Sequence, residues 1–144
     1  MRLKPIETRL SERGPLRACI ERVYKYRRSM ITESICLWRG SRRIDFRVRG
    51  YVGGRFMLLR EVFELGFKPL YAHAEISYGV IERGVEPRTP WDEAKFEFPV
   101  WRWLDVYSAS YGLAILNKGR SGHSINGSSV GITLLKTPIF PNPS

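Results

Sequence analysis

The stretch that decides the fold is Tyr111–Asn117 (YGLAILN), with the segment Lys118–His123 and the run Val130–Lys136 behind it. Two apolar runs separated by a glycine-containing reversal predict a β-hairpin. Directly after them comes Thr137–Ser144 (TPIFPNPS), whose prolines cannot continue a central strand. We therefore expect two paired strands near the end of this chain, followed by an element that a larger protein would supply beyond Ser144.

Segments with the alternation of a half-buried strand recur along the rest of the chain. Glycines, prolines and serines separate them, and no stretch carries the apolar stripe of a helix. Short strands at this spacing predict an all-β fold, an antiparallel β-sandwich that forms a single domain over residues 1–144. The expected strands are Leu16–Arg27, Met30–Trp38, Ile44–Val52, Phe56–Leu65, Tyr71–Ile81, Phe96–Trp103, Tyr111–Asn117 and Ser124–Lys136.

The first two expected strands allow a prediction of register. If they form a hairpin that turns at Arg27 and Arg28, residues whose numbers sum to 55 face one another, and apolar side chains then face apolar side chains. This register places Cys19 opposite Cys36, within reach of a disulfide. Because two cysteines are far fewer than a secreted disulfide framework uses, we favour two reduced, buried thiols.

Composition predicts a water-soluble chain in the cytoplasm with no membrane partner. The 144 residues are 43% hydrophobic, enough for one core. No run approaches the roughly 20 apolar residues that span a bilayer, and Met1–Leu10 alternates charges where a signal peptide would be apolar.

The positive charge lies in one part of the chain. Residues 1–60 hold 16 Lys and Arg against five Asp and Glu, a net charge of +11. Residues 61–144 carry a net charge of −1, which gives the whole chain its +10. A basic surface can bind polyanions, but Arg47 and Arg49 alternate with apolar residues as on the solvent face of a strand. No nucleic-acid-binding motif accompanies the charge, so we favour a solvated sheet surface and do not expect a nucleic-acid partner.

The last third of the chain resembles the C-terminal β-sandwich region of family 38 glycoside hydrolases, the retaining zinc-dependent α-mannosidases. In that family a strand with Gly-x-Ala-x-Leu-Asn, a turn, Leu-Leu-Arg-Ser-Pro and Pro-Asp-Pro follow one another. The matching residues here are Gly112, Ala114, Leu116, Asn117, Gly122, Leu134, Leu135, Lys136, Pro138, Pro141 and Pro143.

The resemblance extends upstream and covers the chain from about Glu7 to Ser144. Two departures stand out: Tyr51–Gly54 occupies the place of the family's Asp-Trp-x-Glu, and the family's Ala-Asp-x-Gly-x-His-x-Phe run after Pro-Asp-Pro is absent. The upstream matches are Glu12, Gly14, Pro15, Leu16, Arg17, Arg43, Ile44, Asp45, Phe46, Leu58, Leu59, Phe63, Tyr78 to Arg83, Phe96, Glu97, Pro99, Arg102, Trp103 and Asp105.

The resemblance implies the galactose-mutarotase-like, or supersandwich, portion of an α-mannosidase, incomplete at its C-terminus. The family's aspartate nucleophile and zinc ligands belong to an N-terminal catalytic domain whose motifs this chain lacks. We therefore expect no catalytic residue, no zinc or other cofactor, and no activity from the chain alone. The expected partners are an α-mannosidase catalytic domain or chain, mannose-containing glycans and, through uncovered apolar surface, a second copy.

The two histidines, His73 and His123, are the candidate metal ligands that the sequence offers. His73 and Glu75 share one face of an expected strand, but a zinc site needs three or four ligands, so we predict a hydrogen-bonded surface pair. His123 falls in the expected hairpin turn, where we predict a structural role.

Aromatic residues offer the remaining functional surface. Exposed rings bind sugars because the apolar face of a pyranose packs on them, which makes Trp91, Trp101 and Tyr107 candidate carbohydrate-binding residues. Trp101 and Trp103 alternate with Val100 and Arg102, so core packing is the competing interpretation, and we predict that Trp103 is core. Two alternative functions follow from these features: a free-standing carbohydrate-binding module, or a basic nucleic-acid-binding β protein.

Overall fold

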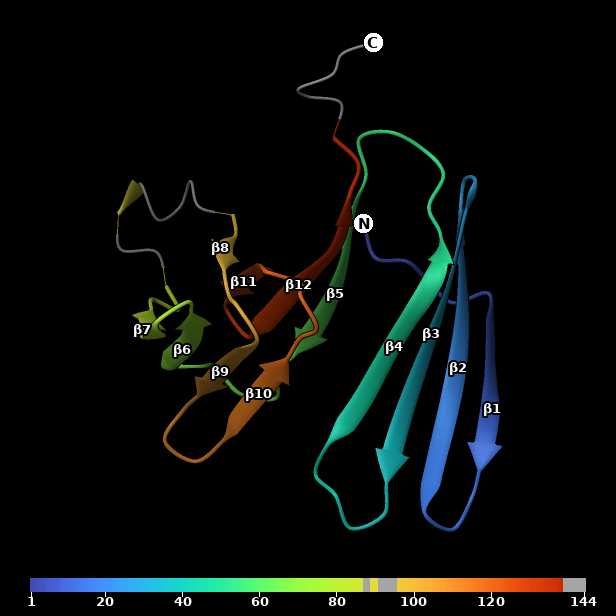
Figure 1. Cartoon of the computed structure of the whole chain (residues 1–144), viewed down its shortest axis with the longest axis horizontal. Helices are drawn as coiled ribbons and strands as arrows, with labels where there is room; N and C mark the ends of the chain where they lie inside the picture. The colour runs from blue at the N-terminus through green and yellow to red at the C-terminus, as the bar shows by residue number, and fades with distance from the viewer. Residues whose placement is uncertain (87–88, 91–95, 139–144) are drawn as a thin grey trace. The chain divides into compact units, whose positions relative to one another are not determined.

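A computed structural model describes residues 1–86, 89–90 and 96–138 of the chain. The strands in these ranges form three four-stranded sheets, and every strand pair is antiparallel (Figure 1). The prediction of an all-β, antiparallel fold is therefore confirmed. The chain divides into two compact units, residues 1–55 and residues 56–144. The prediction of a single domain stays a prediction.

The first unit is one sheet in which the strands lie side by side in chain order, blue to green in Figure 1. Residues that face one another across its central hairpin have numbers that sum to 55, which confirms the predicted register. The turn falls at Arg27 and Arg28, as predicted, and Arg27 adopts a φ of 54°. The strands are β1 (Glu7–Arg13), β2 (Arg17–Tyr26), β3 (Ser29–Trp38) and β4 (Ile44–Tyr51).

One side of this sheet, which we call the apolar face, carries aliphatic and aromatic residues from all four strands, together with Arg22 and the buried Glu33. Within residues 1–55, which the structure describes in full, no second layer covers it. Ile31 is buried on this face, whereas Leu37 and Ile44 are 53% and 51% exposed. The apolar face consists of Leu10, Ile20, Ile31, Ile35, Leu37, Ile44, Phe46 and Val48.

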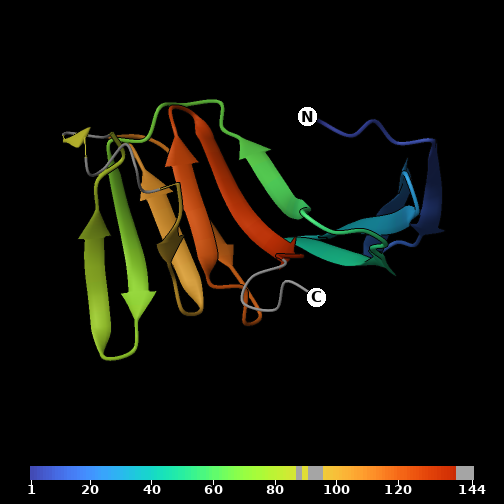
Figure 2. The ribbon, with the colours of Figure 1, turned by 90° about the horizontal axis from the view of Figure 1, so that it is seen from above.

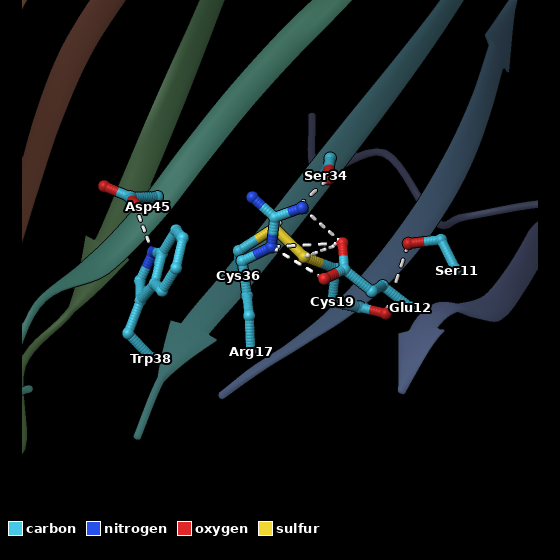
Figure 3. The surroundings of a disulfide bond; sticks show 8 residues. All are labelled: Ser11, Glu12, Arg17, Cys19, Ser34, Cys36, Trp38 and Asp45. Atoms are coloured by element: carbon cyan, nitrogen blue, oxygen red, sulfur yellow. Dashed lines mark hydrogen bonds and ion pairs between the residues drawn. A yellow bond between two sulfur atoms is a disulfide. The ribbon is translucent and has the colours of Figure 1, made fainter. Parts of the chain in front are cut away.

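The opposite side of the sheet carries a disulfide between Cys19 and Cys36, whose Cα atoms lie 4.2 Å apart (Figure 3). Our preference for two reduced thiols is therefore wrong, because the register that brings the residues together also lets them bond. Figure 3 shows Arg17 beside the disulfide, bound to the carboxylate of Glu12. That carboxylate lies 3.8 Å from the Cys19 sulfur.

We expect the disulfide to stabilise the first unit. Replacing both cysteines by alanine should lower its free energy of unfolding by about 3 kcal/mol, the chain-entropy value for a loop of this length. Urea denaturation followed by far-UV circular dichroism measures the change. Iodoacetamide should modify neither cysteine of the native protein without reductant; modification of both before reduction would show free thiols.

The second unit is a β-sandwich of two sheets. One sheet has the strand order β10-β9-β6-β7, and the other has the order β5-β12-β11-β8. Figure 2 shows β6 and β7 as a long hairpin at the edge of the first of these sheets. The strands are β5 (Leu58–Glu64), β6 (Tyr71–Ile76), β7 (Gly79–Arg83), β8 (Phe98–Pro99), β9 (Trp103–Tyr107), β10 (Gly112–Leu116), β11 (Gly122–Asn126) and β12 (Ser129–Lys136).

The core of the sandwich lies between these two sheets. Ala72 and Ala74 on β6 are fully buried, and their small side chains leave room for larger ones from neighbouring strands. The opposing sheet contributes Val130, with Phe63, Phe98 and Ile125 packed around it. The remaining buried members are Val100, Leu104, Val106 and Ile115. This arrangement confirms the predicted β-sandwich for residues 56–144.

The hairpin predicted at the end of the chain is wrong. Strand β10 pairs with β9, whereas β12 pairs with β11 and β5, so the two apolar runs belong to different sheets. The reversal at Lys118–Ser121 carries the chain from one sheet to the other. The hairpin that does form joins β11 to β12 at Gly127, whose φ of 57° glycine adopts without strain.

Two other expected strands are also corrected. Tyr71–Ile81 is interrupted at Ser77 and Tyr78, which form the turn between β6 and β7. In Phe96–Trp103 only Phe98–Pro99 is a strand before β9 begins at Trp103. Among the described residues, no helix has the length and apolar character needed to cross a membrane.

Candidate functional site

Of the predicted sugar-binding aromatic residues, Trp101 and Tyr107 lie at different places in the fold. Trp91 lies outside the described residues. Trp101 precedes the first residue of β9, and Tyr107 is the last residue of that strand. Trp101 lies in a bend before β9 and Tyr107 at its far end, and the strand between them rises about 3.3 Å per residue, so the two rings lie at opposite ends of β9. Trp101 and Tyr107 therefore cannot contact the same sugar ring.

Tyr107 is part of an aromatic cluster on the outer face of its sheet. Its ring stacks on Tyr71, its partner across the strands, at a centroid distance of 5.4 Å. His73 approaches the same ring at 5.4 Å with the two planes tilted. Because other rings already contact Tyr107, less of its surface is open to a ligand than the sequence suggests.

Trp103 is half-buried on the same outer face as Tyr107. The core lies on the other side of β9, where Leu104 and Val106 are fully buried. The prediction that Trp103 belongs to the core is therefore wrong. The sequence pattern predicted a strand over Phe96–Trp103 with Trp103 at its end. In the structure β9 begins at Trp103, and its even-numbered residues, Leu104 and Val106, face the core.

Trp101 lines a shallow cavity of about 330 Å³. Two backbone hydrogen bonds connect the segments around it: the amide of Trp101 donates to the carbonyl of Glu75, and the amide of Val100 donates to the carbonyl of Ser121, both at 2.8 Å. Trp101 is 49% exposed. The cavity is lined by Glu75, Ile76, Ser77, Pro99, Val100, Trp101, Gly119 and Ser121.

The carboxylate of Glu75 lies at the base of this arrangement and is bound to Arg102. The backbone amide of Arg102 donates to it at 3.0 Å, and the guanidinium Nε donates at 3.0 Å. The hydrogen bonds from the Arg102 side chain hold the pKa of Glu75 below its usual value, so this acid stays ionised. The predicted surface pair of His73 with Glu75 is wrong, because Glu75 is buried and bonds to Arg102.

His123 lies in β11 and not in a turn, and it is fully buried. Its Nδ1 atom is 3.2 Å from the carbonyl oxygen of Ser121, and its Nε2 atom has no hydrogen-bond partner. Burial lowers the pKa of His123, because a charged imidazole would lose its water. The imidazole is therefore neutral, with Nδ1–H donating to Ser121.

A buried neutral histidine makes the stability of the second unit depend on pH. Above pH of about 6.5 both folded and unfolded states are neutral at His123; below it only the unfolded state gains the proton, and stability falls by at most about 1.4 kcal/mol per pH unit. The loss continues until the pH reaches the lowered pKa of the folded state.

Urea midpoints at pH 7.5 and 5.5 measure this effect. We expect His123→Leu to reduce the difference between the two midpoints below the wild-type value. An unchanged difference in His123→Leu would contradict the assignment.

A second acid, Glu97, belongs to a polar network on the outer face of the sheet β5-β12-β11-β8. Its carboxylate accepts hydrogen bonds from the hydroxyl of Thr133 and the ammonium of Lys136, and Arg60 lies 3.9 Å away. Partial burial opposes ionisation, but the hydrogen bonds from Lys136 and Thr133 outweigh it and lower the pKa of Glu97. The carboxylate of Glu97 is therefore ionised, and its role is structural.

These features define an all-β domain in which Glu75 and Glu97 are held by basic side chains and the cavity-lining Trp101 is half-exposed. The model of the glycosyl hydrolases family 38 C-terminal domain matches residues 2–144. The chain therefore belongs to that family, and the resemblance found in the sequence is confirmed.

Three relatives show how the chain compares with whole enzymes. Alpha-mannosidase G of Dictyostelium discoideum is 30% identical over 139 residues, which are 93% of this chain and 13% of the relative. Alpha-mannosidase 2C1 of Homo sapiens is 29% identical over 114 residues, 79% of this chain and 11% of the relative. Alpha-mannosidase of Saccharomyces cerevisiae is 31% identical over 88 residues, which are 61% of this chain and 8% of the relative. The chain thus spans 13% or less of these relatives.

The zinc ion implied by the family does not fit the residues in hand. Across residues 1–86, 89–90 and 96–138, no three His, Cys, Asp or Glu side chains come together in a group that could hold a metal. His123 faces the core, and both cysteines form the disulfide. No step of a reaction is therefore derived through zinc.

Proposed function

We propose that this chain is a non-catalytic domain that binds and braces the catalytic part of an α-mannosidase, which hydrolyses α-mannosidic bonds in mannose metabolism. The observation that carries this proposal is the apolar face of the sheet β1–β4. Apolar surface of this extent on a folded unit commonly marks a binding surface, since its burial stabilises a complex. The catalytic part is the occupant that the family supports.

The length of the relatives supports this choice of occupant. The matching segment is only 13% of alpha-mannosidase G, so in that protein a much longer chain is available to cover the segment. The charges of the first unit lie mainly on the other side of the sheet, where Arg9 pairs with Glu21 and Arg43 pairs with Asp45. The apolar face is therefore suited to an apolar partner surface.

The state of the acids supports a non-catalytic role. A glycosidase needs one carboxylic acid that stays protonated near neutral pH, and this requires a raised pKa. The carboxyl groups with shifted pKa values here are all shifted downward by hydrogen bonds or ion pairs: Glu12, Asp45, Glu75 and Glu97. These acids accept hydrogen bonds but are poorly suited to donate a proton.

A paired substitution tests the proposal. The tagged chain is immobilised in an extract of its source cell, and the eluate is assayed with a chromogenic α-mannoside. We expect the wild type to retain α-mannosidase activity and Ile44→Asp, on the apolar face, to lose most of it because a buried charge opposes docking. Arg47→Asp introduces the same side chain on the opposite side of β4 and should retain the activity.

Two outcomes would contradict the proposal: an eluate without α-mannosidase activity, or equal recovery with Ile44→Asp. Light scattering on the purified proteins identifies the competing occupant of the face. A wild-type dimer that Ile44→Asp converts to a monomer, without any retained activity, would assign the apolar face to a second copy.

The cytoplasmic location predicted from the sequence remains a prediction. Disulfides persist mainly in oxidising compartments, so the bond between Cys19 and Cys36 counts against the cytoplasm. Cell fractionation with detection of the tagged chain tests the location directly. The alternative functions, a free-standing carbohydrate-binding module and a nucleic-acid-binding protein, are not favoured by the family to which the chain belongs.

A further inference from the structure

We propose that the cavity lined by Trp101 binds a neutral pyranose ring, so that this domain holds a sugar site of its own. The proposal goes beyond the bracing function, and it rests on that function only for the choice of an α-mannoside as the first probe. Four features of the cavity support it: its size, the fixed position of Trp101, the polar groups at its edge and its charge.

The size of the cavity suits a single sugar ring. Its volume of about 330 Å³ lies at the lower end of the roughly 300–1,000 Å³ typical of small-molecule sites. Three separate segments form it: the end of β6 with the turn that follows, residues 99–101, and Gly119 and Ser121 of the connection from β10 to β11. Because these segments are distant in sequence, only the folded sandwich creates the cavity.

Trp101 is held in place although it lies outside any strand. Its amide donates to Glu75, and on either side of it the amides of Val100 and Arg102 donate to Ser121 and to the Glu75 carboxylate. The Arg102 guanidinium lies 5.7 Å from the centre of the indole ring. A ring fixed in this way loses little conformational entropy when a ligand stacks on it.

The polar groups of the cavity match the hydroxyl groups of a sugar. Ser77 and Ser121 are exposed and place hydroxyl groups at the edge of the cavity. Trp101 and Ile76 supply exposed apolar surface beside them. A pyranose presents the same combination, an apolar ring face with hydroxyl groups around its rim.

The charge of the cavity selects a neutral ligand. Glu75 is the one ionised side chain that lines it. Its carboxylate is paired with the guanidinium of Arg102, so this ion pair offers no unpaired charge to either a cation or an anion. An uncharged polyol with an apolar face is the ligand class that remains.

The aromatic cluster around Tyr107 is the weaker candidate. Its rings stack on one another, as Tyr71 does on Tyr107 and Phe67 does on Tyr111. A sugar would have to displace these ring stacks, whereas Trp101 is half-exposed and, among the described residues, contacts the guanidinium of Arg102 instead of another aromatic ring.

Titration of the full chain tests the proposal by NMR. The chain has four tryptophans, so four indole N–H signals are expected, and Trp101→Phe assigns the one from Trp101. Methyl α-mannopyranoside is added to tens of millimolar, with methyl β-glucopyranoside and methyl β-galactopyranoside as further probes. We expect at least one of the three to shift the Trp101 signal in a saturable way.

A matched pair of variants completes the test. Trp101→Ala should raise the dissociation constant by about tenfold or more, since it removes the stacking surface. Tyr78→Ala removes a fully exposed aromatic ring from the adjacent turn and should leave binding unchanged. If Trp101→Ala does not fold, the presence or absence of a saturable shift of the wild-type Trp101 signal still shows whether a pyranoside binds at this cavity.

Three results would overturn the proposal: no saturable shift of the Trp101 signal with any of the pyranosides, shifts confined to other tryptophans, or unchanged affinity in a folded Trp101→Ala protein. None of these results bears on docking through Ile44, so failure of the sugar site and failure of the bracing function are distinguishable.

Discussion

The structure of residues 56–144 depends on the close packing of two sheets around β6. Ala72 and Ala74 are fully buried and have the smallest side chains that can pack there, which lets Leu104 and Val130 fill the remaining space. This packing fixes β6 beside β9 and therefore fixes the backbone of Glu75, to which Trp101 is hydrogen-bonded. The geometry of the cavity is thus a consequence of the core.

The same packing separates polar chemistry from the interior. His123 is fully buried, and burial keeps it neutral. The acids Glu75 and Glu97 lie on outer faces, where basic partners keep them ionised. A domain built in this way is suited to packing, docking and recognition by surface contacts. The lowered pKa values of Glu75 and Glu97 are the opposite of the raised pKa that the acid of a glycosidase needs.

Short-range patterns in the sequence predicted much of the fold. Alternating apolar residues identified β2, β3 and β4 of the first unit but not β1 (Glu7–Arg13), which no expected strand covers. The pairing rule for the hairpin at Arg27 and Arg28 proved correct to the residue. It also placed Cys19 opposite Cys36. The wrong preference for thiols came from cysteine number and expected compartment, which say nothing about the distance between two facing residues.

Features that depend on distant residues were not predictable in the same way. Alternation continues through Ser77 and Tyr78, so the turn between β6 and β7 leaves no break in the apolar pattern. The hydrogen bonds between Glu75 and Arg102 join positions 27 residues apart, and only the pairing of β6 with β9 brings them together. Trp101 was identified from its residue type, but the cavity beside it required the folded sandwich.

The central claim is that this chain contributes structure and surface to an α-mannosidase and carries no reactive centre. The most direct measurement is the rate at which the purified 144-residue chain, with zinc added, hydrolyses a chromogenic α-mannoside. The account predicts no turnover above that of buffer with zinc. Turnover that co-elutes with the chain through further purification and disappears on metal chelation would contradict it.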